Sequence, residues 1–407
     1  MRDFAAEYRL LADRLMEKGL DVEQIKARLK AQEIETPSWG YSDAGTRFGR
    51  YPQAGAAVTA EEKLADAAQV HKYTGIAPGV AVHVKWDFPD GFDPAICQLA
   101  ESLGVRIGAI NPTCFSDEEG MMGTIANPDP RIRQRAVDHM LESIEIGRQA
   151  GSANLSLWFT DGTNYPGQDD ILQRRRRVTE SLQTVYAAMP ESMQMLIEYK
   201  PFEPAFYHTD IADWGMAYLF AKSCGERAKV LVDLGHHLHG TNIEHLVAVL
   251  LDERMLGGFH FNNARYADDD LMIGSVNPYQ DFLIFDQLVA AELRPDPAPI
   301  AYMIDQSLNV EPKIPGMIQS CLHIQRTYAR ALLVDRQALA QAQAEADIIA
   351  AGQVLTDAYQ TDVEPLLVAV REELGLAPDP LAAYLNSGYQ ERIARERGIR
   401  SGGGGLG

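Results

Sequence analysis

The chain has little cysteine and little positive charge for its length of 407 residues. Its cysteines are far apart and form no C-x-x-C pair, which argues against a thiolate zinc site and against a disulfide framework. They are Cys97, Cys114, Cys224 and Cys321. Lysine and arginine total 37 against 57 aspartates and glutamates, which gives a formal net charge of −20. Because nucleic-acid binding needs a basic surface, this charge argues against a nucleic-acid partner.

Long apolar runs are also missing. No run approaches the roughly 20 residues needed to cross a bilayer. The first residues, MRDFAAEYRLLADRLMEKG, are charged and helical in pattern, without the apolar core of a signal peptide. We therefore expect no membrane association and a cytoplasmic location. Hydrophobic residues make up 46% of the chain and charged residues 23%, which suits a globular protein with a large core.

Short apolar runs recur along the chain, and longer amphipathic stretches separate them. The runs are 79–84, 105–110, 153–158, 194–199, 229–234, 256–261 and 299–305. Each is typical of a strand buried on both faces of a parallel sheet, and PSWG at 37–40 supplies a short first strand. Eight strands alternating with helices predict an α/β fold of the (β/α)8 TIM barrel type. A doubly wound open sheet is the alternative, but no glycine-rich phosphate turn follows an early strand.

Helical patterns flank the predicted barrel on both sides. They lie near 3–17 and 21–31 before it, and near 312–335, 336–350, 352–374 and 389–397 after it. We expect a catalytic barrel with N-terminal helices over 1–335, and a C-terminal helical extension over 336–400 that makes oligomer contacts. The glycine-rich tail 401–407 is low in complexity and is expected to be disordered.

Polar side chains end nearly every apolar run. In a TIM barrel the C-terminal ends of the strands form the active site. The residues there are His83, Asn111, Trp158, Glu198 with Lys200, Asp233 with His236, His260 and Asp305. Singly, each has a structural explanation, such as an ion pair, a turn cap or a hydrogen-bonded histidine. Together, the carboxylates and the imidazole from four successive strands converge and predict a divalent cation site. Its ligands are Glu198, Asp233, His260 and Asp305.

A second acidic cluster follows His260, in the sequence YADDDL. A solvated loop is the plainer explanation of three adjacent aspartates. Beside the first site, however, Asp268 and Asp270 together with His236 predict a second cation site, while Asp269 points away. Oxygen and imidazole donors suit Mn²⁺, the ion we expect, with Co²⁺, Mg²⁺ or Zn²⁺ as alternatives.

The pattern E-x-K, D-x-x-H, H, D-x-D, D resembles the two-metal aldose–ketose isomerases of the xylose isomerase-like barrel superfamily. Within that superfamily the chain is most similar to the broad-specificity L-rhamnose isomerases. The motifs that carry the resemblance span almost the whole chain. They include PSWG, GTRF, VHVKWD, LWFTDGTNYPGQ, VDLGHH, GGFHFN, YADDDL, MIDQS and YQTDVEP. Asn263 and Leu308 depart from the family pattern, where an aspartate and a histidine stand, and this leaves the ranking of sugars open.

The resemblance implies a role for each candidate residue. It places a structural cation, which also binds sugar hydroxyls, on Glu198, Asp233, His260 and Asp305. It places a catalytic cation and its water on His236, Asp268 and Asp270. The residues that it assigns to the sugar are His83, Trp86, Phe115, Trp158 and Phe48, with Lys200 on the terminal oxygen. The chemical step would then involve Lys200, Asp270 and His83.

The resemblance also implies a homotetramer in which Phe48 enters the pocket of a neighbouring subunit. The loop 40–52 favours such a contact, because Tyr41, Phe48 and Tyr51 make it too apolar for free solvent. The partners that we expect are therefore a small sugar and further copies of the chain.

The function implied is the metal-dependent interconversion of L-rhamnose and L-rhamnulose, with transfer of hydrogen between C1 and C2 as hydride. L-lyxose, L-mannose, D-allose and D-allulose are expected as further substrates. Another sugar isomerase of the same barrel superfamily or a ketose 3-epimerase is the alternative, although the D-x-D pair and Lys200 argue against the epimerase. An apurinic endonuclease does not fit the net charge of −20. A sugar-binding barrel without activity is the non-enzyme alternative.

Overall fold

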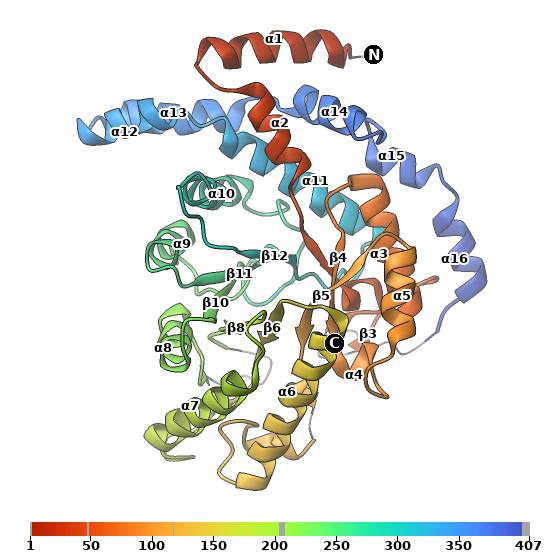
Figure 1. The fold of residues 1–407 in the computed structure, drawn as a ribbon, viewed down its shortest axis with the longest axis vertical. Coiled ribbons are helices and arrows are strands. Elements are labelled where there is room, and N and C mark those ends of the chain that lie inside the picture. Colours follow the sequence, from red (N-terminus) through yellow and green to blue (C-terminus); the bar gives the residue numbers. More distant parts are fainter. Residues whose placement is uncertain (1, 47–48, 117, 203–207, 401–407) are drawn as a thin grey trace.

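Eight parallel strands close into a barrel in the order β1-β12-β11-β10-β8-β6-β5-β4 (Figure 1). The computed structural model describes residues 2–46, 49–116, 118–202 and 208–400. The barrel strands are β1 (Glu35–Pro37), β4 (Gly79–His83), β5 (Arg106–Asn111), β6 (Asn154–Leu157), β8 (Gln194–Glu198), β10 (Ala228–Asp233), β11 (Leu256–Phe261) and β12 (Ala301–Ile304). Most of their residues are buried, as expected for strands covered on both faces. The predicted TIM barrel is confirmed.

Helices alternate with the strands and cover the outside of the barrel (Figure 1). They are α3 (Ala60–Thr74), α4 (Val84–Asp87), α5 (Pro94–Ser102), α6 (Pro130–Ala150), α7 (Ile171–Ala188), α8 (Trp214–Cys224), α9 (Ile243–Asp252), α10 (Pro278–Glu292) and α11 (Lys313–Leu332). Two antiparallel pairs lie in the connecting loops, β2 (Gly45–Thr46) with β3 (Gly49–Arg50) and β7 (Gly162–Thr163) with β9 (His208–Thr209).

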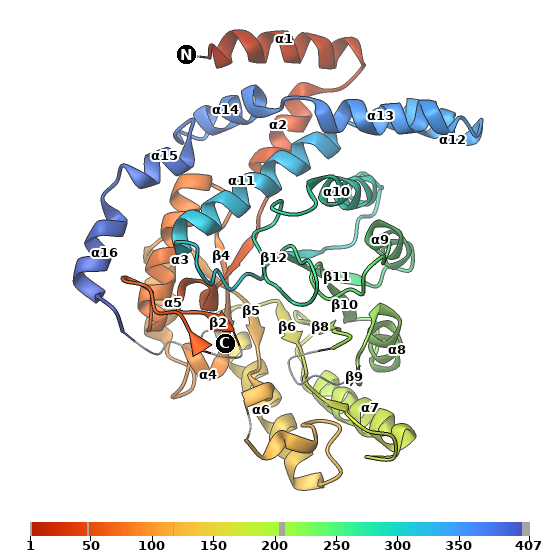
Figure 2. The same cartoon turned by 180° about the vertical axis from the view of Figure 1, so that it is seen from behind.

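Further helices precede and follow the barrel. They are α1 (Phe4–Glu17), α2 (Val22–Lys30), α12 (Arg336–Ala344), α13 (Ile348–Gln360), α14 (Glu364–Glu373), α15 (Pro380–Leu385) and α16 (Tyr389–Arg397). α14 packs against α1, and α15 packs against α3 and α11. In α16, Tyr389 donates a hydrogen bond to Asp66 of α3 at 2.8 Å, and Arg397 pairs with the same carboxylate at 2.7 Å. The last three helices, α14, α15 and α16, therefore pack against other helices of their own chain. In contrast, α12 and α13 extend away from the barrel in both views (Figure 2).

Aspartates begin many of these helices. The N-cap aspartates whose side chains accept a backbone N–H are Asp3, Asp21, Asp93, Asp129, Asp170, Asp213, Asp335, Asp347 and Asp379. A carboxylate at this position satisfies an unpaired donor and interacts favourably with the positive end of the helix dipole. Part of the acidic excess therefore serves local helix structure rather than ligand binding.

Three expectations about local structure were wrong. The first strand is Glu35–Pro37, and PSWG mostly forms a 3-10 helix, Ser38–Tyr41, in which a Cβ at Gly40 would overlap the side chain of Met317. The patterns at 336–350 and 352–374 form three helices rather than two. New helices begin after Asp347, which caps α13, and at the Glu364–Pro365 pair. Tyr41 is fully buried in its own chain, where it donates to Thr36, so it cannot face a neighbouring subunit.

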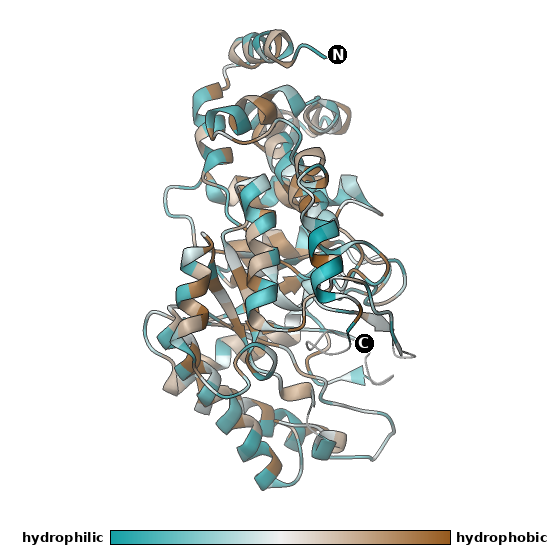
Figure 3. Cartoon of the chain, turned by 90° about the vertical axis from the view of Figure 1, so that its right-hand side faces the viewer, coloured by the Kyte–Doolittle hydropathy of each residue, from teal (hydrophilic) through white to brown (hydrophobic). Residues whose placement is uncertain are grey.

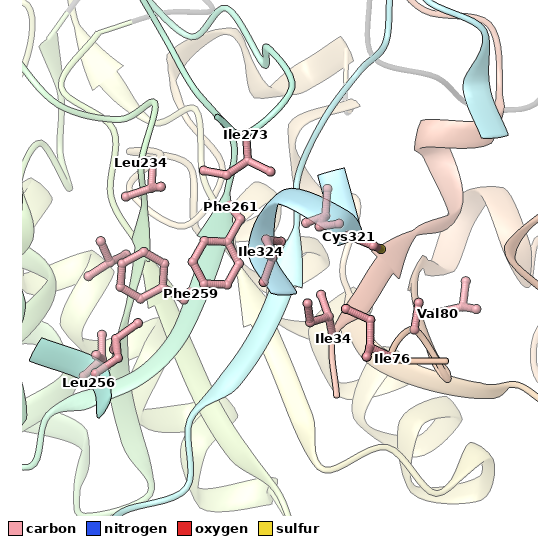
Figure 4. Close-up of a cluster of buried hydrophobic side chains, with 14 of the residues drawn as sticks. Ile34, Ile76, Val80, Leu234, Leu256, Phe259, Phe261, Ile273, Cys321 and Ile324 are labelled. Atoms are coloured by element: carbon pink, nitrogen blue, oxygen red, sulfur yellow. The ribbon is translucent and has the colours of Figure 1, made fainter. Parts of the chain in front are cut away.

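The main core lies between the strands and the helices, and a smaller apolar layer fills the inside of the barrel. Figure 3 shows hydrophobic residues concentrated in the central strands. In the outer core, Phe259 of β11 lies beside Leu256, and Phe261 lies between Phe259 and Ile324 of α11 (Figure 4). The inner layer consists of Trp39, Ala81, Ala109, Leu196, Leu231 and Met303. This layer lies beneath the polar residues at the carboxyl ends of the strands. Within the described part of the chain, every helix is too short or too polar to span a membrane.

Candidate metal centre

The four residues predicted to form the first cation site do converge. Glu198 and Asp233 end β8 and β10, His260 stands one residue before the end of β11, and Asp305 follows β12. The register pairs Asp233 with His260, which brings neighbouring strand ends to one level. One ligand atom from each of the four residues lies within 4.8 Å of all the others. Nδ1 of His260 is 3.3 Å from Glu198 Oε1, 3.6 Å from Asp233 Oδ2 and 3.5 Å from Asp305 Oδ2.

A second ligand group shares a residue with the first. Asp233, His236 and Asp268 each offer a ligand atom within 4.8 Å of the other two. His236 Nε2 lies 3.2 Å from Asp268 Oδ1, and its Nδ1 lies 3.1 Å from Glu198 Oε1. The structure thus brings two of the three predicted residues together and adds Asp233, which stands in both groups.

Asp270, the third residue predicted for this second group, is turned elsewhere. Its carboxylate accepts a hydrogen bond from Ser307 at 2.6 Å, although it still lines the pocket. Its backbone has a positive φ of 46°, which is costly for a residue with a side chain and is typical of functional loops. Asp269, expected to point away, accepts hydrogen bonds from the backbone N–H groups of Arg265 and Tyr266 in its own loop.

The charges in this region strongly shift the pKa of each group. Burial would raise the pKa of Glu198, but the charges and hydrogen bonds of His260 and His236 outweigh it and lower the pKa to about 2. Burial would likewise lower the pKa of both histidines, but the surrounding carboxylates raise it well above 6.5. Burial raises the pKa of Asp305 to about 7. Without a cation, the histidines therefore carry the positive charge that the crowded carboxylates require.

The donor set fits a divalent cation. Nδ1 of His236 and Oδ1 of Asp268 are buried and lack hydrogen bonds of good geometry, although both face opposite charges at ion-pair distance. A buried polar atom without a hydrogen bond is costly. These two atoms are therefore better explained as metal ligands than as structural groups. Carboxylate oxygens and imidazole nitrogens together suit ions such as Mn²⁺ or Mg²⁺.

Lys200 is the fixed cation beside this group. Its ammonium donates a hydrogen bond to Oδ2 of Asp268, the oxygen that does not face His236. It also lies 5.2 Å from the centre of the Trp158 ring. The ammonium and the carboxylate of Asp268 form a largely buried ion pair. The ammonium is thus held at the border between the ligand groups and an aromatic wall.

Aromatic rings line the side of the pocket opposite the carboxylates. The ring of His83 lies 4.7 Å from Trp39, 4.3 Å from Trp86 and 5.6 Å from Phe115. Phe115 continues to Trp158 at 5.1 Å. Burial, helped by the charge of Lys63, lowers the pKa of His83 to about 3, so its imidazole is neutral. A neutral ring offers one donor and one acceptor to a bound molecule.

Several predicted contact residues lie away from the pocket wall. Trp86 packs behind His83 and against Phe115 rather than on the pocket lining. Leu308 is a buried core residue that packs on Gly316. Phe48 lies outside the described residues. His83, Phe115 and Trp158 do line the pocket.

The pocket also contains residues that sequence reasoning did not select. Trp39 donates its indole N–H to Oδ1 of Asp305 at 2.9 Å, so it orients a predicted ligand. Ser156 Oγ and Trp158 Nε1 are buried without a hydrogen-bond partner and belong to pocket-lining residues. Trp39 could have been identified from the sequence, because it directly follows the first strand within PSWG. Ser156 lies inside an apolar run, and nothing in the sequence marks it as a pocket residue.

Comparisons with known proteins agree with this fold. A family model described as the xylose isomerase-like TIM barrel matches residues 65–287. A probable sugar isomerase of Rhizobium meliloti (strain 1021) is 42% identical over 408 residues, covering 98% of this chain and 94% of that protein. A xylose isomerase of Thermus thermophilus is 25% identical over 252 residues, covering 56% of this chain and 63% of that protein. A solved L-ribulose 3-epimerase has a TM-score of 0.53 at 14% identity, covers 78% of this chain and 98% of its own, and shows the shared fold.

Proposed function

The chain belongs to the xylose isomerase-like TIM barrel family, and we propose that it interconverts an aldose and its ketose with the help of two divalent cations. The coarser assignment, a sugar isomerase or epimerase, rests on that family and on the relative named a probable sugar isomerase. The more specific proposal, an aldose–ketose isomerase, rests on one observation. The two ligand groups share Asp233 and adjoin the buried ammonium of Lys200.

The reaction moves a hydrogen between C1 and C2, and negative charge develops on the oxygens of both carbons. When bound, the cations supply Lewis-acid polarisation of these oxygens. Lys200, already fixed by Asp268 and Trp158, donates to the oxygen at which charge grows, without reorganisation of the pocket. Asp270, whose pKa burial raises, receives the proton of one hydroxyl at its carboxylate and returns it to the other oxygen once the hydrogen has moved. The ring of Trp158, which lies against Lys200, excludes water from the migrating hydrogen, which favours a hydride shift.

The substrate we propose is L-rhamnose, with L-rhamnulose as its product. L-rhamnose is a 6-deoxy sugar, and its methyl group needs an apolar surface at the end remote from the cations. Phe115 offers such a surface in the pocket. One methyl or hydroxyl difference in an apolar pocket changes binding by only about 1–3 kcal/mol. L-lyxose, L-mannose, D-allose and D-allulose are therefore proposed as weaker substrates.

A ketose 3-epimerase is the second candidate, because the solved structures that share the fold include an L-ribulose 3-epimerase. That likeness, at 14% identity, concerns the fold alone. The feature that separates the two reactions is the second ligand group with Lys200, which serves a carbonyl at the end of the sugar chain. An epimerase acting at C3 has no such need.

The decisive experiment is a product analysis with a metal-free control. The protein is dialysed against a chelator, Mn²⁺ is restored, and a panel of aldoses and ketoses is analysed by chromatography. Ketose formation from L-rhamnose that requires Mn²⁺ supports the proposal. A C3-epimeric ketose formed from D-allulose, without any aldose, supports the epimerase instead. A higher kcat/KM for D-xylose than for L-rhamnose would refute the substrate assignment and leave the isomerase assignment standing.

Three further proposals concern the assembly, the ion and the cellular location. We propose a homotetramer, Mn²⁺ as the bound ion and a cytoplasmic enzyme. Tyr51, which is 47% exposed, and the extended α12 and α13 are the surfaces that favour subunit contacts. Light scattering that finds an active monomer would contradict the tetramer.

A further inference from the structure

The loop that carries Asp268 is closed at its base by a pair of backbone hydrogen bonds. Asn263 N donates to Leu271 O at 2.8 Å, and Leu271 N donates to Asn263 O at 2.9 Å. Residues 264–270 therefore form a closed loop after β11, and this loop carries Asp268 and Asp270. Its inner side faces His236, and its base faces the helices α10 and α11.

The side chain of Asn263 joins this base to the next turn and to α10. Its Oδ1 accepts from the N–H of Val276 at 3.1 Å. Its Nδ2 donates to the carbonyl of Asn262 at 2.9 Å and to Oδ1 of Asp281 at 3.3 Å. The amide of Asn263 is buried, so these hydrogen bonds satisfy polar atoms that water does not reach.

Asp281 continues the connection to α11. Its Oδ2 lies 3.0 Å from Nε2 of His323, and its carboxylate also accepts the backbone N–H of Gly274. The Asp281 side chain is only 2% exposed, which makes this a pair inside the scaffold rather than a surface contact. Gly274 has a positive φ of 83°, and a Cβ there would overlap the His323 ring. The loop backbone therefore lies directly on the histidine.

We propose that Asn263, Asp281 and His323 form a clamp that fixes loop 263–276 on α10 and α11 and thereby sets the cation affinity of the second ligand group. These three are positioning residues, since none touches Glu198, Asp233 or the other ligands directly. The inference rests on the proposed function only in requiring that the second group binds a cation.

The physical reason is the entropy of ordering a loop. A ligand on a loop that is already fixed loses little freedom when the cation binds, whereas a ligand on a loosened loop must be ordered at that moment. Outer partners that orient metal ligands are worth about 10–100-fold in affinity. The clamp acts through the backbone rather than through a ligand atom, so we expect the lower end, about 10-fold. The first ligand group lies on strand ends and should be unaffected.

The test is a Mn²⁺ titration of the full-length, metal-free protein without sugar, with free Mn²⁺ followed by electron paramagnetic resonance. The variants are Asp281→Ala and His323→Gln, the latter keeping a side-chain N–H. The matched control is Asp286→Ala, on the same helix, equally buried, and paired with Arg336 instead of the loop. We expect Asp281→Ala to weaken one of two sites about 10-fold, His323→Gln to weaken it less, and Asp286→Ala to leave both unchanged. Faster hydrogen exchange over 263–276 should accompany the weaker site.

Two outcomes would overturn the clamp. One is a Mn²⁺ titration of both clamp variants that matches the wild type. The other is an equal loss at both sites in the clamp variants and in Asp286→Ala, since that indicates general destabilisation. If Asp281→Ala does not fold, His323→Gln decides by the same criteria. A wild type that binds no Mn²⁺ refutes the proposed function, and hydrogen exchange of the loop in His323→Gln against wild type then decides on the clamp by itself.

Discussion

The two ends of the barrel interior each contain a carboxylate, and the pKa values of the two shift in opposite directions. At the carboxyl end, Glu198 lies 3.1 Å from His236 and 3.3 Å from His260, and its pKa falls to about 2. At the amino end, Glu35 accepts a hydrogen bond from the backbone N–H of Ala109 at 2.8 Å, and burial raises its pKa. An apolar layer with Leu231 and Met303 separates the ends.

The difference shows that burial of an acid does not by itself make a site. Glycines at 79 and 108 leave the space that the Glu35 side chain occupies, but among the described residues no ion pair holds it, and the charge of Arg106 does not outweigh burial. Around Glu198, the chain places two imidazoles and further carboxylates, so that charge is retained and concentrated. A functional site is recognised better by several converging charged side chains, whose ligand atoms lack hydrogen bonds, than by a perturbed pKa alone.

The largest loss is expected when charge is removed from the carboxyl end at Asp268. Asp268→Asn should lower turnover of L-rhamnose by more than the about 10²–10³-fold that loss of one preorganised donor costs. The reason is that Asp268 serves both the second ligand group and Lys200. Steady-state assays with Mn²⁺ and a thermal melt would measure turnover and folding. Asp269→Asn is the control, and equal activity in the two variants would contradict the assignment.

The next effect is expected at Lys200, a buried ammonium at the carboxyl end that is held against the ligand carboxylate of Asp268. Lys200→Met should lower kcat by about 10²–10³-fold, the usual cost of a lost charge-stabilising donor. KM should change much less, because the cations still bind the sugar. A variant that loses only thermal stability, with kcat intact, would show that Lys200 is a structural partner of Asp268.

A smaller effect is expected at Trp39, which connects the inner apolar layer to the ligand groups. Trp39→Phe keeps the ring against His83 and removes the N–H that Asp305 accepts. Because Asp305 then loses an orienting partner, cation affinity of the first group should fall by about 10-fold, the lower end of the range for such partners. The Mn²⁺ titration described above measures this. An unchanged affinity would mean that the other strand ends suffice to orient Asp305.

The sequence predicted the carboxyl end well because strand ends can be recognised locally. Apolar runs gave the strands, and a polar residue closing each run gave Glu198, Asp233, His260 and Asp305. What it did not predict depends on contacts between distant segments. Asp233 belongs to both ligand groups because β10 lies between β8 and β11 in the sheet.

Two other features required backbone geometry that spacing does not contain. Asp270 faces Ser307 because its φ is positive, and Trp39 reaches Asp305 because the chain turns into a 3-10 helix after β1. The same limit applies to Asp281 and His323, which lie on different helices and pair only after α10 and α11 pack. Glu35 gave no signal either, since one acid in a short strand is common.

The smallest effect, and the one that best tests the comparison, is expected at the amino end. The fold raises the pKa of Glu35 above its ordinary value of 4.5, so it favours the neutral acid. The stabilisation from the neutral form is complete below pH 4.5 and is lost as the pH rises through the folded-state pKa. Glu35→Gln is neutral at every pH and still accepts the N–H of Ala109. Its free energy of unfolding should therefore equal that of the wild type in acid and exceed it at pH 8, measured by urea denaturation, with kcat unchanged. If Glu35→Gln instead lowers kcat or is less stable at pH 8, the carboxylate has a charged role at the amino end, and the contrast with Glu198 fails.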